Sequence, residues 1–466
     1  MSSDPLTPQP RSDLGSTNQS SVQSLAQVNT ETNTETNSET NTETNSETNT
    51  GPLRGLRVIE LASEAGAYAG KLLADFGAEV LLVEPPGGHH TRTFEPIISV
   101  GDSNSLLTSP VSASEQSLWF AHYNTSKLSV ELDLNTDDGA TKFRELLGYA
   151  DIVLESEPIG RLASLGLDYE QLKTVASNVV WGSVTSFGRN DPRSALPSTN
   201  LTVVAAGGMA WSCGYDDVSG SPPMAALGNQ GYQTGSLWAA VGIMMAIRAR
   251  TITGRGQLVD ASLHAAVNVT TEQATQWWLI AGQVVRRQTG RHASYVPTDP
   301  TIFLDRDGRE VHTGFPPRHA PELVKLLAWI DELELRAEMP LIGLIELAVE
   351  QGGIDLARVV DDELVAEMYR TVRDAVVLIA SKMSAREFFV EGQTRGFAVG
   401  MVLSPDEVMI DEHLVARGYP ALVYQPQINR SVLHPGLPIR FTGTPGRITH
   451  APTLGSSRAE FTSQPG

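Results

Sequence analysis

The sequence is poor in cysteine and in long apolar stretches. Among its 466 residues there is one cysteine, Cys213, which excludes an internal disulfide and any zinc site built from several cysteines. No stretch remains apolar over the roughly 20 residues that a membrane span needs, and the chain starts with neither a basic segment nor an apolar run. These absences predict a soluble, cytoplasmic protein without membrane contacts.

Basic residues are also scarce. Lysine and arginine number 34 against 54 acidic residues, which gives a formal net charge of −20. Residues 1 to 50 carry −6 of this charge, seven acids against Arg11, so −14 belongs to the rest of the chain. Long-range attraction for nucleic-acid phosphate is missing, although local basic groups can hold one small anionic ligand. We expect no nucleic-acid partner, and the separated histidines have no metal-ligand spacing.

The glycine turn that binds phosphate in dinucleotide-binding proteins is absent too. A strand over 57–61 is followed by the turn 62–67, which reads Ala-Ser-Glu-Ala-Gly-Ala instead of Gly-x-Gly-x-x-Gly. Glu64 therefore puts a carboxylate where a pyrophosphate would lie. This argues against NAD and FAD, and we expect no tightly bound cofactor.

Strands that alternate with helices are what the sequence does contain. We expect strands over 57–61, 79–86, 128–134, 151–155, 179–184 and 257–263, and helices over 62–76, 135–147, 169–175 and 237–250, with a further helix reaching 278. Residues 135–138 supply the cap and acidic first turn of the second helix. The alternation predicts an α/β fold with a mostly parallel sheet covered on both faces. The polar, serine-rich segment 89–117 is expected to be a loop, and helix 237–250 is expected to be buried.

Four segments follow from changes in composition. Residues 29–49 repeat a four-residue unit without any apolar side chain, so 1–50 is predicted to be a disordered tail. Residues 51–265 form the first part of a large domain, and 266–394 form a smaller α+β middle domain with a hairpin at Asp307-Gly308. Residues 395–466 return to the large domain with short strands and Pro/Gly turns.

A series of motifs in this order is similar to the family III coenzyme A transferases, which include formyl-CoA transferase, carnitine CoA-transferase and the α-methylacyl-CoA racemases. The resemblance covers nearly everything after Gly51. The segments that carry it are 51–58, 73–80, 83–88, 124–134, 165–169, 250–260 with its Thr-Gly-Arg-Gly-Gln core, 395–396, 404–408, 416–418 and 451–455. It implies a Rossmann-like large domain built from both ends of the chain, and an interlocked dimer with each active site between the large domain of one subunit and the small domain of the other.

The resemblance also implies a covalent reaction, in which an aspartate attacks the CoA thioester and then carries CoA as an aspartyl thioester. The matching turn places Asn229 at the aspartate position when it is aligned from the left, and Gly231 when it is aligned from the right. Neither residue can ionise. In the racemases a Gly-His-Asp sequence lies upstream, and Ser198, Thr199 and Asn200 stand there in this chain, so the proton-transfer pair is missing as well.

The CoA contacts implied by the resemblance are altered in the same way. Glu64 replaces a glutamine in the first turn, Ser156-Glu157 replaces an Asn-Phe pair, and Ser164 replaces a basic residue. The candidate CoA and substrate contacts are Ser63, Glu64, Ala65, Arg92, Lys127, Ser156, Glu157, Arg161, Thr199, Asn200 and Gln230. Other readings stay open: Lys127 and Arg161 as surface charges, Glu64 as a helix-dipole partner, and Asn229 and Gln230 as turn residues.

Three functions remain. The first is transfer of CoA between an acyl-CoA and a carboxylic acid, with Glu64 as the substitute nucleophile. The second is a non-catalytic subunit that forms a heterodimer with a catalytically intact relative, rather than a homodimer. The third is an acyl-CoA-binding protein. In each of them a coenzyme A thioester is the expected ligand.

Overall fold

The computed structural model describes residues 50–99, 115–225, 227–314, 316–456 and 461–462. The predicted disordered tail lies outside these residues except for Thr50. Two compact units divide the chain: a larger unit of Met1–Met209, Ala225–Glu272 and Asp406–Gly466, and a smaller unit of Ala210–Met224 and Gln273–Pro405. The sequence placed the return to the large domain at 395, whereas the smaller unit continues to 405.

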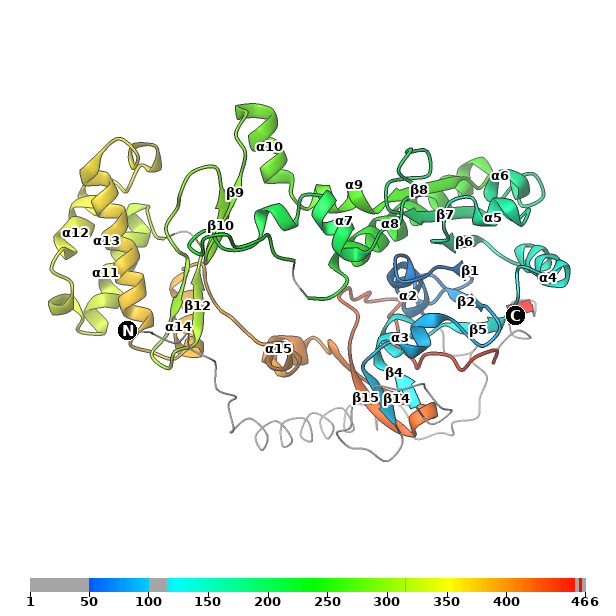
Figure 1. Cartoon of the computed structure of the whole chain (residues 1–466). Helices are drawn as coiled ribbons and strands as arrows, with labels where there is room; N and C mark the ends of the chain where they lie inside the picture. Colours follow the sequence, from blue (N-terminus) through cyan, green and yellow to red (C-terminus); the bar gives the residue numbers. More distant parts are fainter. Residues whose placement is uncertain (1–49, 100–114, 226, 315, 457–460, 463–466) are drawn as a thin grey trace, which may run out of the picture. The chain divides into compact units, whose positions relative to one another are not determined.

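A six-stranded sheet forms the centre of the larger unit (Figure 1). Its strands, in spatial order, are β5 (Leu128–Glu131), β2 (Glu79–Glu84), β1 (Arg57–Leu61), β6 (Ile152–Glu155), β7 (Val180–Thr185) and β8 (Leu258–Ser262). Every neighbouring pair is parallel. The predicted α/β class with a parallel sheet is confirmed. By chain order the strands run 3-2-1-4-5-6, the order of doubly wound nucleotide-binding folds.

Helices cover both faces of this sheet because alternate strand residues point to opposite sides. The helices of the larger unit are α2 (Ala67–Asp75), α3 (Leu118–Tyr123), α4 (Asp137–Leu147), α5 (Arg161–Ser164), α6 (Tyr169–Leu172), α7 (Asn200–Ala206), α8 (Gln230–Thr253), α9 (Leu263–Val269), α15 (Pro405–Ile410) and α16 (Glu412–Ala416). Val58 and Val80 pack with α2 and α8 on one face. Ile59 and Leu81 pack with Phe143 of α4 on the other. Both faces of the sheet are therefore covered by packed helices.

Part of the segment predicted as loop is strand. After the 3-10 turn η1 (His90–Thr93), β3 (Ile97–Ser99) pairs antiparallel with β4 (Glu115–Ser117). Ser117 then caps α3 by accepting from the backbone N–H of Phe120. Residues 100–114 of the predicted loop lie outside the described residues. The pairing joins segments that are separated by this gap, so no local pattern marks it.

Helix α8 differs from the buried helix that its composition predicts. Ala239, Ile243 and Ile247 are buried against the sheet, but Trp238 and Met245 on the opposite side are 47% and 66% exposed. Because apolar residues occur on every side of this helix, the sequence pattern does not show which side is buried and which is exposed. The helix predicted to reach residue 278 is interrupted: α9 ends at Val269 and α10 (Glu272–Ala281) follows.

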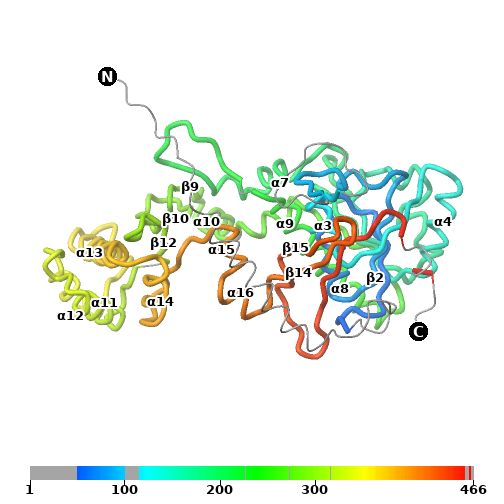
Figure 2. Tube along the Cα trace, turned by 90° about the horizontal axis from the view of Figure 1, so that it is seen from below, coloured from blue at the N-terminus to red at the C-terminus, as the bar shows by residue number. Residues whose placement is uncertain are grey.

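The C-terminal segment lies along the first strands of the larger unit, as the red end of the tube shows (Figure 2). It follows the hairpin of β14 (Pro420–Gln425) and β15 (Arg430–Pro435), with the 3-10 turn η5 (Pro426–Ile428) between them. The backbone N–H groups of Thr449 and Gly455 donate to the hydroxyls of Ser126 and Ser129, over 2.9 Å and 3.1 Å. Residues more than 320 positions apart thus share one unit.

The smaller unit combines short strands with a helical layer. Its strands are β9 (Arg286–Gln288), β10 (Arg291–Ser294), β11 (Ile302–Leu304), β12 (Glu310–Thr313) and β13 (Val399–Met401). Its α-helices, besides α10, are α11 (Ala320–Glu332), α12 (Ile342–Glu350), α13 (Glu363–Ala380) and α14 (Ala385–Arg395). The 3-10 turns are η2 (Ala210–Ser212), η3 (Arg336–Glu338) and η4 (Leu356–Arg358). The predicted hairpin is present as β11 and β12, with Gly308 at φ +77°. Trp329 and Phe388 lie in the core of this unit. None of the helices described here is both long and apolar enough to span a bilayer.

A buried histidine gives the larger unit an acid-sensitive point. His434 of β15 is 3% exposed, and its Nε2 atom accepts from Gln425 Nε2 over 3.1 Å. Burial, assisted by the charge of Lys71, lowers the pKa of His434 to about 4. Below about pH 6.5 the unfolded chain therefore binds a proton that the folded chain does not take up until about pH 4. Stability is lost as the pH falls through this range.

We predict that His434→Gln removes this loss, because glutamine keeps an acceptor at the same reach but does not titrate. The difference in free energy of unfolding between the wild type and His434→Gln should shift by about 2 kcal/mol in favour of the variant between pH 7 and pH 5. Urea denaturation at the two pH values measures it. A difference that stays constant would contradict a neutral, buried His434.

Candidate functional site

The candidate site lies where the order of the strands reverses. β1 and β6 are neighbours, and the chain leaves them for opposite halves of the sheet, which opens a crevice at their carboxyl ends. Ser63 follows β1 and Ser156 follows β6. The Ser63 backbone N–H donates to Ser156 Oγ over 2.7 Å, and their two Oγ atoms lie 3.0 Å apart. Three predicted contacts, Ser63, Ser156 and Glu157, thereby line one crevice, whereas Glu64 beside Ser63 lines neither of its cavities.

Two cavities flank this pair of serines. One of about 450 Å³ is lined mainly by apolar and hydroxyl side chains, including Ile159, Ser198 and Tyr232. The other, of about 400 Å³, mixes apolar side chains with charged ones, Asp133 and Arg161 among them. Ser63, Ser156, Glu157 and Pro158 line both. The crevice therefore offers two compartments side by side, in the size range of small-molecule sites, and the second carries most of the charged side chains.

The turn that carries Glu64 is fixed against α8. Ser236 of α8, which is fully buried, donates its hydroxyl to the carbonyl oxygen of Ala65 over 2.8 Å. Ala65 also lines the larger cavity. The Glu64 carboxylate is one-third exposed and lies 3.3 Å from Nε2 of His90. The only carboxylate in this turn is thus partly held by a ring nitrogen and remains open to a ligand.

Asn229 stands at the start of α8. It occupies the N-cap position without a capping hydrogen bond from its side chain, and its carbonyl accepts from the backbone N–H of Gln233. Gln233 donates through Nε2 to the hydroxyl of Tyr123 over 2.7 Å, and Asn229 acts with it to lower the pKa of Tyr123. Since the first backbone N–H groups of a helix have no partner within it, this end of α8 presents donors together with an amide and a phenol.

Glu64 acts electrostatically on the tyrosines at this helix end. Burial raises the pKa of Tyr123, hydrogen bonds from Gln233 and Asn229 lower it, and the charge of Glu64 raises it. Burial, followed by the charge of Glu64, raises the pKa of Tyr232 to about 12. Both phenols therefore remain protonated donors at neutral pH. The carboxylate of Glu64 and the amide of Asn229 belong to one electrostatic neighbourhood around Tyr123.

Two residues stand at the place of the racemase Gly-His-Asp sequence and contribute hydrogen bonds here, Asn200 to the start of α8 and Thr199 to the cap of α7. Asn200 accepts from the backbone N–H of Tyr232 over 3.1 Å, and its Nδ2 donates to the Gly228 carbonyl over 3.3 Å. Thr199 caps α7. Gln230 is exposed, whereas Gly231 is buried with Val204 only 2.9 Å from the place of a Cβ atom. Gly231 therefore has no room for a side chain, which leaves Asn229 as the position from which a side chain can act.

Lys127 lies away from the crevice. Its amine is fully buried and donates to Glu60 Oε1 over 2.7 Å, to the carbonyl of Ala67 and to Asn124. All three ammonium donors are used inside the larger unit. Burial lowers the pKa of Lys127 and raises that of Glu60, with each partner opposing the other's shift. The candidate ligand contact is a buried ion pair in this structure.

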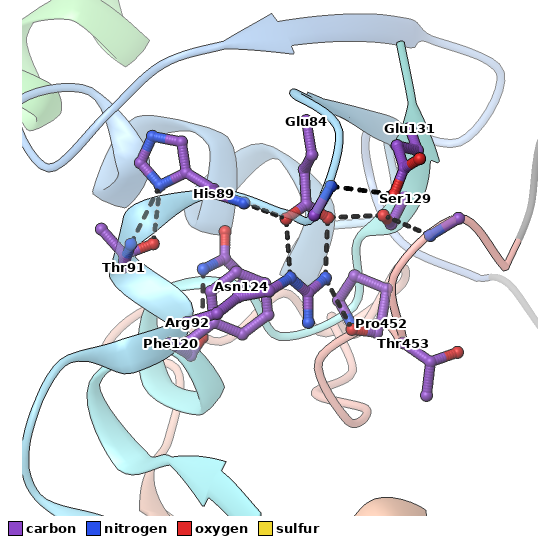
Figure 3. A network of polar contacts seen from close by, with 12 residues as sticks. Glu84, His89, Thr91, Arg92, Phe120, Asn124, Ser129, Glu131, Pro452 and Thr453 are labelled. Atoms are coloured by element: carbon purple, nitrogen blue, oxygen red, sulfur yellow. Dashed lines mark hydrogen bonds and ion pairs between the residues drawn. The ribbon is translucent and has the colours of Figure 1, made fainter. Parts of the chain in front are cut away.

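Arg92 is likewise engaged within the fold (Figure 3). It forms a bidentate pair with Glu84, over 2.6 Å and 2.7 Å, donates to the Pro452 carbonyl and lies over the Phe120 ring at 4.0 Å. Burial raises the pKa of Glu84, but the bonds from Arg92 and Ser129 outweigh it, so that the pKa is lowered. Arg92 thus holds the C-terminal segment on the sheet and lines neither cavity.

Arg161 does line the charged cavity, but it is paired. Its Nε atom lies 2.7 Å from Oε2 of Glu157, and one terminal nitrogen donates to Asn135 Oδ1 over 3.4 Å. Burial raises the pKa of Glu157, although Arg161 acts in the opposite direction. Arg161 and Glu157, both named as candidate CoA contacts, therefore neutralise one another at the crevice.

Sequence reasoning missed Tyr123, Gln233 and the pairing of His90 with Glu64. Tyr123 is the last residue of α3, which begins directly after the segment 89–117 that was predicted to be a loop. The Ser117 cap before the apolar residues 118–123 was the available signal. Gln233 lies one turn from Asn229 on the predicted turn, but its partner Tyr123 is 110 residues away. Among the described residues, no three histidine, cysteine, aspartate or glutamate side chains are grouped so that they could hold a metal ion.

Comparison with known proteins gives one consistent result. The family model described as CoA-transferase family III matches residues 53–458. The chain is 29% identical to the succinyl-CoA:(R)-benzylsuccinate CoA-transferase subunit BbsE of Thauera aromatica, over 87% of this chain and 92% of that protein. It is 28% identical to a succinyl-CoA:mesaconate CoA-transferase of Haloarcula hispanica, over 89% and 97%.

A solved structure supports the fold alone. The crystal structure of a CAIB/BAIF family protein from Brucella suis matches with a TM-score of 0.67 and 24% identity, over 87% of this chain and 97% of that chain. The agreement extends over nearly the whole of the described chain. The mixed α/β architecture with its central parallel sheet is therefore shared with that protein.

Proposed function

Because the chain belongs to CoA-transferase family III, we propose that it transfers coenzyme A from an acyl-CoA thioester to a carboxylic acid. The observation that carries the proposal is the family match over residues 53–458. The relatives named above act on a succinyl-CoA donor and an organic acid. The acyl-CoA and the acid are the partners of the reaction, and neither a tightly bound cofactor nor a metal takes part. A cytoplasmic location and an interlocked dimer belong to the same proposal.

The crevice offers a place for an elongated thioester. The cavity with charged side chains, including Arg161, suits the nucleotide end of CoA, and the cavity lined mainly by apolar and hydroxyl side chains suits the pantetheine arm and the acyl group. Ser63 and Ser156, which line both, lie where the arm crosses between them. This placement follows the rule that ligands of open α/β sheets bind outside the carboxyl ends of the strands at the switch point.

The nucleophile is Glu64 in this proposal. In the resemblance described above, the family carries a glutamine at position 64 and an aspartate at position 229, whereas this chain carries Glu64 and Asn229. One carboxylate and one amide are kept, with their places exchanged. Both side chains act on the pKa of Tyr123, which the charge of Glu64 raises and Asn229 lowers. The exchange thus keeps a carboxylate and an amide in a single neighbourhood.

The chemistry follows from a carboxylate in this position. A Glu64 oxygen attacks the thioester carbonyl carbon, the carbon–sulfur bond breaks, and a mixed anhydride and the CoA thiolate form. The thiolate then attacks the glutamyl carbonyl, which releases the donor acid as its carboxylate and leaves glutamyl-CoA. An acceptor carboxylate reverses both steps. No net proton is exchanged, and each tetrahedral oxyanion is stabilised by donors from Tyr123, Asn229 and the start of α8.

A direct assay tests the function. The purified full chain is incubated with acyl-CoA donors, succinyl-CoA among them, and a panel of mono- and dicarboxylic acids, and the products are separated by liquid chromatography and mass spectrometry. The proposal expects a new acyl-CoA in equal amount to the donor acid released. Hydrolysis of the donor to free CoA without a new thioester would contradict it.

A second candidate is a subunit of a heteromeric transferase. It is favoured by the benzylsuccinate relative, which is itself named as a subunit. In that case the chain alone shows no transfer, and activity appears only when an aspartate-bearing partner is mixed with it. Transfer by the single purified chain, together with a single species in size-exclusion chromatography with light scattering, would argue for the first candidate.

A further inference from the structure

Arg161 has a special place in the crevice. Among the described residues that line the two cavities, it is the only arginine or lysine. The charged cavity otherwise presents two histidines and the acids Glu84, Asp133 and Glu157. A ligand with phosphate groups needs a cation, and the planar guanidinium of arginine suits phosphate well. Any phosphate of a ligand in this crevice therefore depends on Arg161.

In this structure the guanidinium of Arg161 is already paired with the carboxylate of Glu157. Glu157 is the second residue after β6, and its backbone N–H donates to Glu155 Oε2 over 2.8 Å, which fixes the start of the loop. Gly160 takes a left-handed conformation, φ +86°, at the cap of α5 and turns Arg161 back toward Glu157. The result is the 2.7 Å contact between Nε and Oε2, with Arg161 41% and Glu157 26% exposed. Both partners remain within reach of a ligand.

Spacing alone does not explain this pair. Ion pairs between residues four apart also join Asp138 with Lys142 on α4 and Glu391 with Arg395 on α14, and none of these residues lines either cavity. Such pairs on a helix surface act mainly as local helix support. Glu157 differs because it lines both cavities and because burial raises its pKa. A carboxylate that was useful only for stability has no reason to stand at the rim of two compartments.

We propose that Glu157 is a built-in competitor for phosphate on Arg161. The ligand's phosphate can displace Glu157 from the guanidinium and leave that carboxylate without its partner. Otherwise it has to bind beside an arginine whose charge Glu157 already neutralises. Glu157 thereby weakens binding of every ligand that carries phosphate at this point, and it selects against ligands that offer phosphate alone. The inference rests on the proposed function, since it takes CoA as the ligand, and it adds a residue that sets the affinity.

Binding measurements with matched variants test the inference. Isothermal titration of the full chain uses three probes: CoA, dephospho-CoA without the 3′-phosphate, and pantetheine without any phosphate. The proteins are the wild type, Glu157→Gln, Arg161→Gln and the double variant. Glu170→Gln is the control, because it removes the same single charge from an exposed pair with Lys173 on α6, away from both cavities. Thermal unfolding verifies that each variant is folded.

Glu157→Gln is expected to bind CoA about tenfold more tightly than the wild type, because a neutral amide leaves the guanidinium available. Arg161→Gln should bind it about tenfold more weakly, and in the double variant the gain from Glu157→Gln should disappear. Pantetheine affinity should be the same in all proteins. If dephospho-CoA shows the same gain as CoA, the diphosphate is the group at Arg161; if the gain vanishes, the group is the 3′-phosphate.

Two results would overturn the inference. An unchanged or weaker CoA affinity of Glu157→Gln would show that Glu157 does not compete, and an equal gain for pantetheine would show that phosphate is not involved. In both cases the wild type still binds CoA, so the proposed function stands. If neither the wild type nor any variant binds CoA, the proposed function fails together with the inference.

Discussion

Glu64→Gln is expected to lower the kcat of CoA transfer on the order of a thousandfold or more, because an amide cannot form the mixed anhydride. The substitution keeps the shape of the side chain, and glutamine is the residue that the family resemblance implies here. Substrate affinity should change far less than kcat. Steady-state kinetics with saturating acyl-CoA measures the effect. Full activity of Glu64→Gln would exclude Glu64 as the nucleophile.

The double variant Glu64→Gln, Asn229→Asp is the informative control. It restores the arrangement that the resemblance implies, with the amide in the first turn and the carboxylate at the start of α8. Because both positions act on Tyr123, we expect it to recover at least about tenfold in kcat over Glu64→Gln. Glu170→Gln, which changes an exposed pair on α6, should retain wild-type kinetics. No recovery in the double variant would indicate that the two positions are not interchangeable.

Lys127→Met should destabilise the larger unit by about 3–5 kcal/mol, since it leaves a buried carboxylate without its cation. Glu60 is fully buried, and its Oε2 atom has no hydrogen-bond partner among the described residues even with Lys127 present. The backbone of Gly70 leaves the space for this carboxylate, because a Cβ there would lie 2.0 Å from Oε2. The free energy of unfolding at pH 7, from urea denaturation, measures the loss.

The control for this prediction removes both charges. The double variant Glu60→Leu, Lys127→Met should recover most of the lost stability, because an apolar pair of similar volume has no charge to desolvate. Lys142→Met, from a surface pair with Asp138, should change stability by less than about 0.5 kcal/mol. A loss below about 1 kcal/mol in Lys127→Met would mean that Glu60 finds another partner or is protonated at little cost.

The core of the fold was predictable because its signals are local. The apolar runs of β1 and β2 flank a helix of small residues. The polar residues before Asp137 indicate the N-cap that Thr136 provides for α4. The hairpin of the smaller unit required only the Asp307-Gly308 turn. In each case residues close in sequence determine the structure, so a pattern of spacing is sufficient evidence.

The direction of charged side chains was not predictable in the same way. Lys127 has its partner Glu60 67 positions earlier, and Arg92 reaches Pro452 360 positions later. The local sequence around a lysine or arginine beside a strand does not show whether its side chain faces a ligand or an internal carboxylate. Of the residues that the sequence named, Ser63, Ala65, Ser156, Glu157 and Arg161 line the crevice, and all of them lie in short consecutive motifs. The surroundings of Tyr123, where Gln233 donates to the phenol and the charge of Glu64 raises its pKa, depend on tertiary packing.

Mapping the covalent adduct tests most directly whether the attacking carboxylate has moved from position 229 to position 64. The full chain is incubated with acyl-CoA, treated with hydroxylamine to trap a glutamyl thioester or anhydride as a hydroxamate, digested and analysed by mass spectrometry. We predict a hydroxamate on Glu64 that requires acyl-CoA and is absent from Glu64→Gln. A hydroxamate on a different acid, or CoA transfer that proceeds with no modified residue, would contradict the assignment.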